Sequence, residues 1–302
     1  MDGIINIYKE EDFTSFDVVA KLRGILHQKK IGHTGTLDPM AEGVLPVCLG
    51  SATKLCETLT DHDKIYETVM ILGVTYDTLD VTGKKLTEEK VMSTEQEVIS
   101  AIKSFVGGYD QIPPMYSAKK VDGVRLYDLA RQGKSVERKS NHVDIYEIEI
   151  LSIELPRVTM RVHCGKGTYI RSLISDIGAK CGCGAAMEKL LRTKVGNFDL
   201  STAIKLSEVE ELMKSSLIEE KVLRVDSVFL DKKQIVLPKE LSRFVENGNK
   251  LIKEDFEKIG EELLSELENG EKVRIYDFEG RFRAVYEFDK ERLEMKPFKM
   301  FL

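Results

Sequence analysis

The amino-acid sequence predicts an α/β (α+β) chain that ends in a separate, smaller β-rich domain. Its 302 residues are enough for about two domains. Alternating apolar and polar residues at 66–73 indicate a strand, whereas a helical period at 94–105 indicates an amphipathic helix. After Asp231 the pattern changes to short strands divided by turns, so we divide the chain into residues 1–228 and 229–302.

The N-terminal elements are a strand, a capped helix and a long loop. Residues 4–8 form an apolar run with β-branched members, typical of a short strand. Thr14 or Ser15 supplies the side-chain cap of a helix whose apolar positions follow at once. Residues 29–50 are rich in Gly and Pro and lack a helical period. This composition indicates an ordered loop that runs into a strand at 44–48.

The middle of the chain alternates helices and strands. The helix at 94–105 is followed by paired glycines, a common way for a helix to end. Residues 142–155 and 157–164 are expected to be two consecutive strands. A helix at 168–180 is again stopped by glycines, and a helix with a polar face is expected at 207–220.

The C-terminal domain is expected to consist of short strands. Its middle pair is joined by Glu279-Gly280, a turn signal. The four strands are expected at 234–238, 272–278, 281–288 and 292–297.

The bulk composition is that of a soluble globular protein, with 42% hydrophobic and 32% charged residues. No apolar run approaches the ~18 residues of a membrane-spanning helix. The first six residues have neither a basic stretch nor an apolar stretch of the kind found in secretory signals. We therefore expect a protein of the cytoplasm that has no membrane contact.

The cysteines do not form a metal motif. There are five, an odd number, and Cys181-Gly-Cys183 lacks a second Cys or His pair nearby. Small free thiols packed near a helix end explain them, so we expect neither a metal site nor a disulfide.

Charge is distributed unevenly along the chain, although its sum is only −6. Residues 111–139 carry seven Lys or Arg against three acidic residues, and residues 157–194 carry eight against two. Residues 199–271 reverse the sign, with 18 acidic against 11 basic residues. Two basic segments beside an acidic one favour a polyanion that docks on one side. Solvated charged faces would give the same pattern, so charge alone leaves both interpretations open.

The segment at 32–47, GHTGTLDPMAEGVLPV, is the most informative part of the sequence. Its glycines permit backbone angles closed to other residues. Pro39 moves Asp38 away from helical geometry towards an extended conformation. The segment therefore presents a carboxylate from a stiff loop, although an ordinary turn would use the same residue types.

This segment closely resembles the signature of the TruB family of pseudouridine synthases, in which the aspartate is catalytic. Three further blocks in the same order resemble the family's second block, the start of its RNA-gripping insertion and the block that supplies its active-site arginine. The resemblance covers about residues 3–205, and beyond them it depends on strand pattern alone. The blocks are KIY at 64–66 with DTLD at 77–80, QIPPMYSAKKVDG at 111–123, and KGTYIRSL at 166–173.

The resemblance implies three catalytic residues, with Asp38 as the nucleophile. Arg171 would be its charge partner, because burial under a uracil raises the pKa of a carboxyl and a nearby cation opposes that shift. Tyr66 would stack on the base and handle a proton. From local sequence alone, Arg171 could be a surface arginine and Tyr66 a core tyrosine.

Further residues are expected to contact the substrate. His33 would fill the space that the everted base leaves, because the base must leave its stack before reaction. Leu190 would close over the base, with an ordinary helix-core leucine as the alternative. The remaining candidates are Tyr169, Lys166 and Asp80, together with Lys120 and Arg131 of the insertion. The alternative for Asp80 is to brace its own loop, and the alternative for Tyr169 is packing alone.

The insertion at about 111–141 mixes basic residues with tyrosines. Lys and Arg bind phosphates without reading sequence, and aromatic rings offer faces for unstacked bases. We interpret it as an arm that grips RNA, with a solvated helical hairpin as the alternative. The C-terminal domain resembles a PUA module, an RNA-binding barrel, although its flank at 254–271 is acidic.

The implied fold is that of the pseudouridine synthases, a large mixed, mainly antiparallel sheet flanked by helices. The implied reaction converts uridine 55 in the T loop of tRNA to pseudouridine. It needs no cofactor, because nothing is oxidised or added, and no protein partner is expected. Two alternatives stay open, a guide-RNA-dependent box H/ACA synthase and a tRNA-folding chaperone for which modification is secondary.

Overall fold

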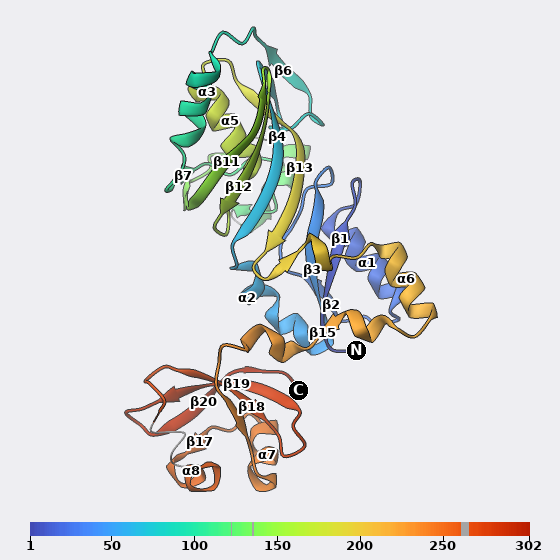
Figure 1. Cartoon of the computed structure of the whole chain (residues 1–302), viewed down its shortest axis with the longest axis vertical. Helices are drawn as coiled ribbons and strands as arrows, with labels where there is room; N and C mark the ends of the chain where they lie inside the picture. Colours follow the sequence, from blue (N-terminus) through green and yellow to red (C-terminus); the bar gives the residue numbers. More distant parts are fainter. Residues whose placement is uncertain (122, 135, 261–265) are drawn as a thin grey trace.

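A long twisted sheet runs through most of the molecule, and a smaller sheet forms one end of it (Figure 1). The structure is a computed structural model that describes residues 1–121, 123–134, 136–260 and 266–302. In these residues no helix is both long enough and apolar enough to cross a membrane. All five cysteines are free thiols.

Nine strands of the described residues make up the large sheet. Neighbouring strands of this sheet are antiparallel, except that β13 and β3 run parallel. The prediction of a mixed, mainly antiparallel sheet is therefore confirmed. The order is β11 (Ile145–Glu154), β12 (Arg157–Cys164), β4 (Lys64–Leu72), β13 (Ala185–Val195), β3 (Glu42–Leu49), β1 (Gly3–Lys9) and β15 (Val222–Leu223), with β14 (Phe198–Asp199) beside β13 and β2 (Ile31–His33) beside β3.

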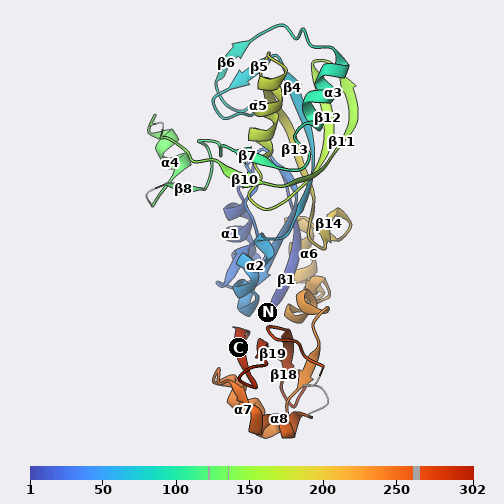
Figure 2. The same cartoon turned by 90° about the vertical axis from the view of Figure 1, so that its left-hand side faces the viewer.

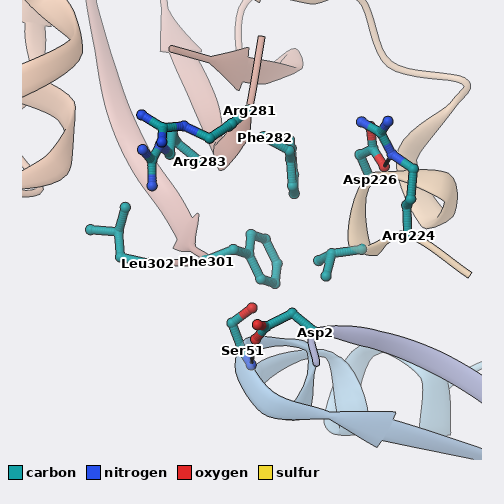
Figure 3. A pocket seen from close by; sticks show the side chains of 10 residues that line it. Asp2, Ser51, Arg224, Asp226, Arg281, Phe282, Arg283, Phe301 and Leu302 are labelled. Atoms are coloured by element: carbon teal, nitrogen blue, oxygen red, sulfur yellow. Dashed lines mark hydrogen bonds and ion pairs between the residues drawn. The ribbon is translucent and has the colours of Figure 1, made fainter. Parts of the chain in front are cut away.

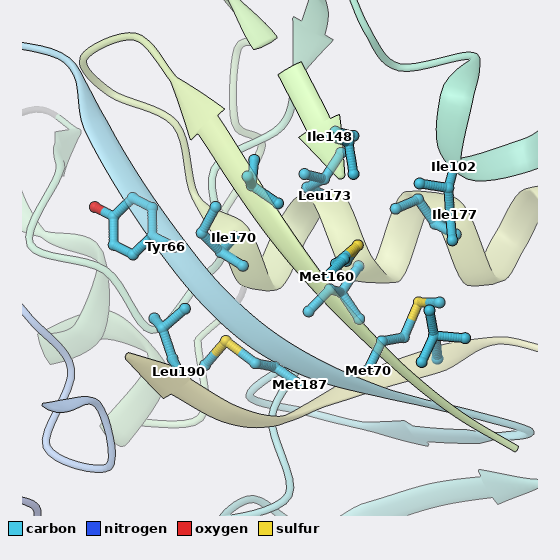
Figure 4. Close-up of a cluster of buried hydrophobic side chains, with 14 of the residues drawn as sticks. Tyr66, Met70, Ile102, Ile148, Met160, Ile170, Leu173, Ile177, Met187 and Leu190 are labelled. Carbon is cyan, nitrogen blue, oxygen red and sulfur yellow. The ribbon is translucent and has the colours of Figure 1, made fainter. Parts of the chain in front are cut away.

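Helices α3 (Glu95–Lys103) and α5 (Ile170–Lys180) cover one face of the β11–β13 half of the sheet. Figure 4 shows how α5 packs there, with Leu173 and Ile177 against Met160 of β12. Burying one aliphatic side chain of this kind contributes roughly 1.5–3 kcal/mol. This cluster is the larger core of the chain, and its open end lies beside the candidate site.

The other end of the sheet is covered by α1 (Ser15–Ile25) and α6 (Leu206–Lys214). Thr14 caps α1 with its side chain, which confirms the expected helix start. The prediction of a helix at 207–220 was wrong about where the helix ends, because α6 stops at Lys214. Ser216 adopts φ 60°, a left-handed conformation that an α-helix cannot contain.

Strand β13 was not predicted, although it is the longest strand of the sheet. Its sequence AAMEKLLRTKV consists largely of strong helix formers. Pairing with β4 on one side and β3 on the other overrides that preference. Leu190 therefore lies on a strand, and the interpretation of it as a helix residue was wrong.

The C-terminal part contains a curled five-stranded sheet with two helices (Figure 1). The expected strands are present, and the resemblance to a PUA module agrees with this curled sheet. The strands follow the order β16 (Gln234–Val236), β18 (Lys272–Tyr276), β19 (Phe282–Asp289), β20 (Glu294–Met300) and β17 (Leu251–Ile252), and the helices are α7 (Lys239–Glu246) and α8 (Lys253–Ile259).

The two parts pack through a shared apolar cluster that joins Ile4 and Cys48 to Val285 and Phe301. Beside it lies a cavity of about 430 Å³ (Figure 3). Its arginines are already paired with carboxylates, and it does not include Asp38. Arg224 bonds to Asp226, and Arg281 and Arg283 bond to Asp277.

The insertion stands out from the body of the molecule (Figure 2). It carries a small hairpin and the short helix α4 (Leu126–Arg131). Other short elements are β8 (Lys120–Val121), β9 (Val124–Arg125), β7 (Tyr109–Gln111) paired with β10 (Asn141–Val143), β5 (Val74–Tyr76) paired with β6 (Lys85–Glu88), and α2 (Cys56–Thr60).

Candidate active site

The loop between β2 and β3, residues 34–41, presents Asp38 and is called the nucleophile loop below. Several hydrogen bonds fix it. The backbone amide of Leu37 donates to Oγ of Ser15 at 2.9 Å, and the amide of Thr34 donates to the carbonyl of Pro46 at 3.1 Å. The amide of Ala41 donates to the carbonyl of Asp38 itself at 3.0 Å. The loop is thus rigidly held on both sides of the carboxylate.

Lys9, at the end of β1, holds the second half of this loop through hydrogen bonds to its backbone. Its side chain is fully buried, and its ammonium donates to the carbonyl of Pro39 at 3.0 Å and to that of Ala41. Burial lowers the pKa of Lys9 to about 8, while the nearby Asp38 opposes that shift. Lys9 is therefore a second basic group near the Asp38 carboxylate, in addition to Arg171.

Arg171 lies at the first turn of α5 and forms an ion pair with Asp38. Its Nη2 is 2.9 Å from Oδ1 of Asp38, and its Nη1 is 3.3 Å from Oδ2 of Asp80. It also donates to the carbonyl of Thr78 at 2.9 Å and to that of Tyr116 at 2.7 Å. Its side chain is only 5% exposed. Arg171 is therefore a buried guanidinium that joins three segments, not a surface residue.

The Asp38 carboxylate is in a mixed environment. Its side chain is 32% exposed, so solvent or a ligand reaches it from one side. Burial raises the pKa of Asp38 above its ordinary value, the Arg171 cation lowers it, and the Asp80 carboxylate raises it again. The net direction is upward. This matches the expectation that a covered carboxyl needs a cation beside it to stay ionised.

Asp80 is buried, with 5% of its side chain exposed. Besides Arg171, it accepts hydrogen bonds from the hydroxyl of Thr78 at 2.9 Å and from the hydroxyl of Thr82 at 2.5 Å. Its oxygens are thus occupied by protein groups. The geometry makes it a partner of Arg171 and leaves little of it for a direct RNA contact.

Tyr66 and Leu190 form an apolar wall near the carboxylate, at one end of the core (Figure 4). They lie on the neighbouring strands β4 and β13, and both are 8% exposed. Leu37 and Ala41 of the nucleophile loop belong to the same cluster. Burial raises the pKa of Tyr66 to about 12, so its hydroxyl is protonated at neutral pH.

The other predicted substrate contacts lie at varying distances from this centre. His33 precedes the nucleophile loop, and its Nδ1 accepts from the amide of Gly35 at 3.3 Å. Burial lowers the pKa of His33, which favours the neutral ring. The backbone of Tyr169 is held by the side chain of Gln111 at 2.8 Å. Lys166 is at the surface, where it pairs with Asp61 at 3.0 Å.

The insertion contacts this centre through the carbonyl of Tyr116, which accepts from Arg171. Arg131 is exposed and lies over the ring of Tyr127, with 5.5 Å between the guanidinium carbon and the ring centroid. The backbone of Lys120 forms β8, whereas its side chain is outside the described part of the chain.

Three residues at the site were missed by sequence reasoning. They are Lys9, Gln111 and Arg192, all buried polar side chains. Lys9 directly follows the strand expected at 4–8, and Arg192 lies in a run of helix formers for which no strand was predicted, so neither position indicates burial. Gln111 is the first residue of the QIPPMY block. Its membership of that block was the signal that could have pointed to it, since the sequence does not show that its side chain bonds to Tyr169, next to Arg171.

Solved structures share this fold. The chain superposes on a chain of an H/ACA ribonucleoprotein bound to a substrate RNA containing 2′-deoxyuridine, with a TM-score of 0.71 and 26% identity over 99% of this chain and 85% of that one. It superposes on a chain of a Cbf5–Nop10–Gar1 complex with a TM-score of 0.71 and 27% identity over the same shares. Because 99% of this chain is covered in both superpositions, each includes the large sheet and the curled C-terminal sheet of this chain.

Family models define the class. Residues 23–170 match the N-terminal domain of the TruB family pseudouridylate synthases, and residues 171–240 match the C-terminal domain of tRNA pseudouridylate synthase B. The chain is 51% identical to tRNA pseudouridine synthase B of Lachnoclostridium phytofermentans, with 100% of both chains covered. It is 44% identical to the protein of the same name from Clostridium acetobutylicum, over 96% of this chain and 97% of that one. This chain belongs to the TruB family.

Proposed function

We propose that this chain converts uridine 55 in the T loop of tRNA to pseudouridine, as a stand-alone enzyme of the cytoplasm. The observation that carries the proposal is the ion pair of 2.9 Å between Asp38 and Arg171, presented by a rigid loop beside an apolar wall. The full-length similarity to bacterial proteins named tRNA pseudouridine synthase B supports tRNA as the substrate.

The reaction breaks the bond from C1′ to N1, turns the uracil and joins C1′ to C5. The hydrogen of C5 leaves and N1 gains one, so atoms and electrons balance without a cofactor. Asp38 is the nucleophile. Its Oδ1 is bonded to Arg171, while in the described residues its Oδ2 has no hydrogen-bond partner. One oxygen is thus oriented by protein and the other faces the substrate.

Ionised Asp38 serves each of the three routes to the product, namely attack at C6, capture of the sugar at C1′, and removal of the C2′ proton. All three need a charged carboxylate in a covered pocket. Arg171 opposes the rise in pKa that burial causes, and Asp80 holds Arg171 in place through its second Nη. Such pairing of a nucleophile with a cation is a general means of activation.

Tyr66 and Leu190 form the wall on which the uracil lies. The ring of Tyr66 stacks on the base, and its hydroxyl exchanges a proton when C5 loses its hydrogen. Because the pKa of Tyr66 is raised to about 12, the protonated form is the resting state at neutral pH. Leu190 closes the pocket from the adjacent strand.

Eversion of the base costs a few kcal/mol of stacking. His33, which directly precedes the nucleophile loop, occupies the vacated space, and Tyr169 and Lys166 line the approach. The arm at 111–141 grips the RNA, with Arg131 and the side chain of Lys120 as phosphate contacts.

Isomerisation without a guide RNA is the decisive test. Purified protein is mixed with unmodified tRNA that carries tritium at C5 of uridine, with no guide RNA and no other protein. Release of tritium from a transcript with uridine 55, and its absence when that base is cytidine, supports the proposal.

The same assay separates the two alternatives. Release only after addition of guide RNA and partner proteins supports the guide-dependent type. Refolding of tRNA without release supports a chaperone. The length of the insertion favours the stand-alone type, because a guide-dependent enzyme leaves substrate gripping to its partners.

A further inference from the structure

Arg192 is the largest fully buried side chain of the described residues, with 1% exposure. It lies on β13, in the centre of the large sheet. Its Nε donates to the carbonyl of Val44 at 2.8 Å, and its Nη2 donates to the carbonyl of Gly35 at 3.3 Å. Within the described ranges, no carboxylate lies within ion-pair distance of it. A cation in such a place is costly unless its donors are used.

The donors of Arg192 reach both ends of the nucleophile loop. Gly35 is the second residue of the loop, and Val44 lies on β3 beyond its end. The backbone of Arg192 also pairs with Gly43 across the parallel β13–β3 contact. Gly43 has a φ of +106°, and a Cβ there would lie 2.2 Å from the carbonyl oxygen of Arg192. Arg192 therefore holds the loop that carries Asp38, together with Ser15 and Lys9.

The same residue faces Tyr66. Arg192 and Tyr66 are directly opposite each other in the antiparallel pairing of β13 with β4. Both are buried, and on this face of the sheet they are neighbours of Leu190. Cross-strand neighbours of this kind have Cβ atoms about 4.5–5.5 Å apart, which is within reach of a guanidinium.

The pKa shifts of Arg192 and Tyr66 agree with a close approach of the two side chains. Burial lowers the pKa of Arg192, and the neighbouring Tyr66 opposes that shift. Conversely, burial raises the pKa of the Tyr66 phenol, and Arg192 is the group that opposes this rise most. The guanidinium thus favours negative charge on the phenol oxygen.

We propose that Arg192 is a positioning residue for the reaction. It fixes the position of the Tyr66 phenol relative to the nucleophile loop. The distance between these two sides of the base pocket therefore stays constant. It acts through Tyr66 and through the loop, and it does not itself touch the base. The inference rests on the role proposed above for Tyr66.

A merely structural arginine would have a different signature. Its loss would lower stability, and any loss of rate would be independent of Tyr66. A positioning residue lowers the rate of the chemical step while leaving tRNA affinity in place, and its effect depends on the group that it positions. A misplacement of about 1 Å in an active site can cost on the order of 100-fold in rate.

The test is a double-mutant cycle between Arg192→Met and Tyr66→Phe. Single-turnover rates of tritium release are measured at saturating protein, together with the Kd for tRNA. Arg161→Met is the matched control, because Arg161 lies on the same sheet but its side chain is 43% exposed and paired with Glu67. We expect Arg192→Met to lower the rate about 100-fold with a Kd within a few-fold, and Arg161→Met to change neither.

The cycle decides the mechanism. In the Tyr66→Phe background, Arg192→Met should cost far less than it does alone, because the hydroxyl that it positions is absent. Equal losses in both backgrounds would overturn the Tyr66 arm, and an unchanged rate in Arg192→Met would overturn the whole proposal. If Tyr66→Phe alone keeps the full rate, the proposed role of Tyr66 fails. The claim that Arg192 acts through Tyr66 then fails as well, whereas the claim that it acts through the loop is tested separately.

The loop arm has its own measurement. Hydrogen exchange of the amides in residues 33–44 should accelerate in Arg192→Met and remain unchanged in Arg161→Met. Unchanged exchange in Arg192→Met would overturn the loop arm. If Arg192→Met does not fold, Arg192→Lys replaces it. It keeps the charge but cannot bond to Gly35, Val44 and Tyr66 at once, so a full rate in that variant would count against the proposal.

Discussion

Replacing Arg171 with Met perturbs the site at the point where three segments meet. The variant keeps the length and apolar stem of the side chain and removes its donors. Asp80 then loses its only cation among the described residues, although it stays 5% exposed. Asp38 also loses its partner, but it is 32% exposed and solvent compensates part of the loss.

The magnitude follows from burial. Removing one partner of a buried ion pair costs about 3–5 kcal/mol, because the remaining charge is left unpaired. The pair with Asp38 is partly exposed, and its loss adds about 1 kcal/mol. We therefore expect Arg171→Met to lower the free energy of unfolding by about 3–5 kcal/mol, with Asp80 as the main cause.

Urea unfolding followed by circular dichroism measures this loss, since the chain has no Trp for fluorescence. The double variant Arg171→Met/Asp80→Asn removes the stranded charge, so it should be more stable than Arg171→Met by at least about 1 kcal/mol. A loss below about 1 kcal/mol in Arg171→Met, the range of exposed pairs, would refute the reasoning. So would a double variant that is less stable than the single one.

Three further predictions concern activity. The pKa of Asp38 is raised by burial and lowered by Arg171, so the rate should fall as pH drops through that raised pKa, and Arg171→Met should move this acid limb to higher pH. A pH profile of tritium release with an unmoved limb would contradict this. His33→Ala should lower kcat/KM roughly 10–100-fold for folded tRNA, since eversion costs a few kcal/mol, and much less for an unstructured oligonucleotide; equal losses on both substrates would count against a wedge. Arg131→Ala should weaken tRNA binding and reduce the salt slope of log Kd by about 1, with the saturated single-turnover rate unchanged, and an unaltered slope would exclude a phosphate contact.

The local signals in the sequence were sufficient for most of the fold. The cap at Thr14, the alternation of β4 and the glycines after α5 act over a few residues, so they are visible without tertiary structure. Strand β13 was missed for the opposite reason. Its helix-forming residues become a strand only because β4 and β3 provide pairing partners that are more than 100 residues away in sequence.

The site divides in the same way. Asp38, Tyr66 and Arg171 lie in motifs, so resemblance could point to them before any geometry was known. Lys9 and Arg192 lie outside the blocks that carried that resemblance. Their importance comes from burial and from bonds to backbone carbonyls of a distant loop. Spacing and composition do not encode these contacts, and only the folded chain reveals them.

Asp38→Asn tests the central claim most directly, since it keeps the shape of the side chain and removes its charge. The account predicts that this variant binds unmodified tRNA within a few-fold of the parent and releases no tritium from C5 of uridine, even with protein in excess over RNA. Release at a measurable fraction of the parent rate would contradict the assignment of the nucleophile to Asp38.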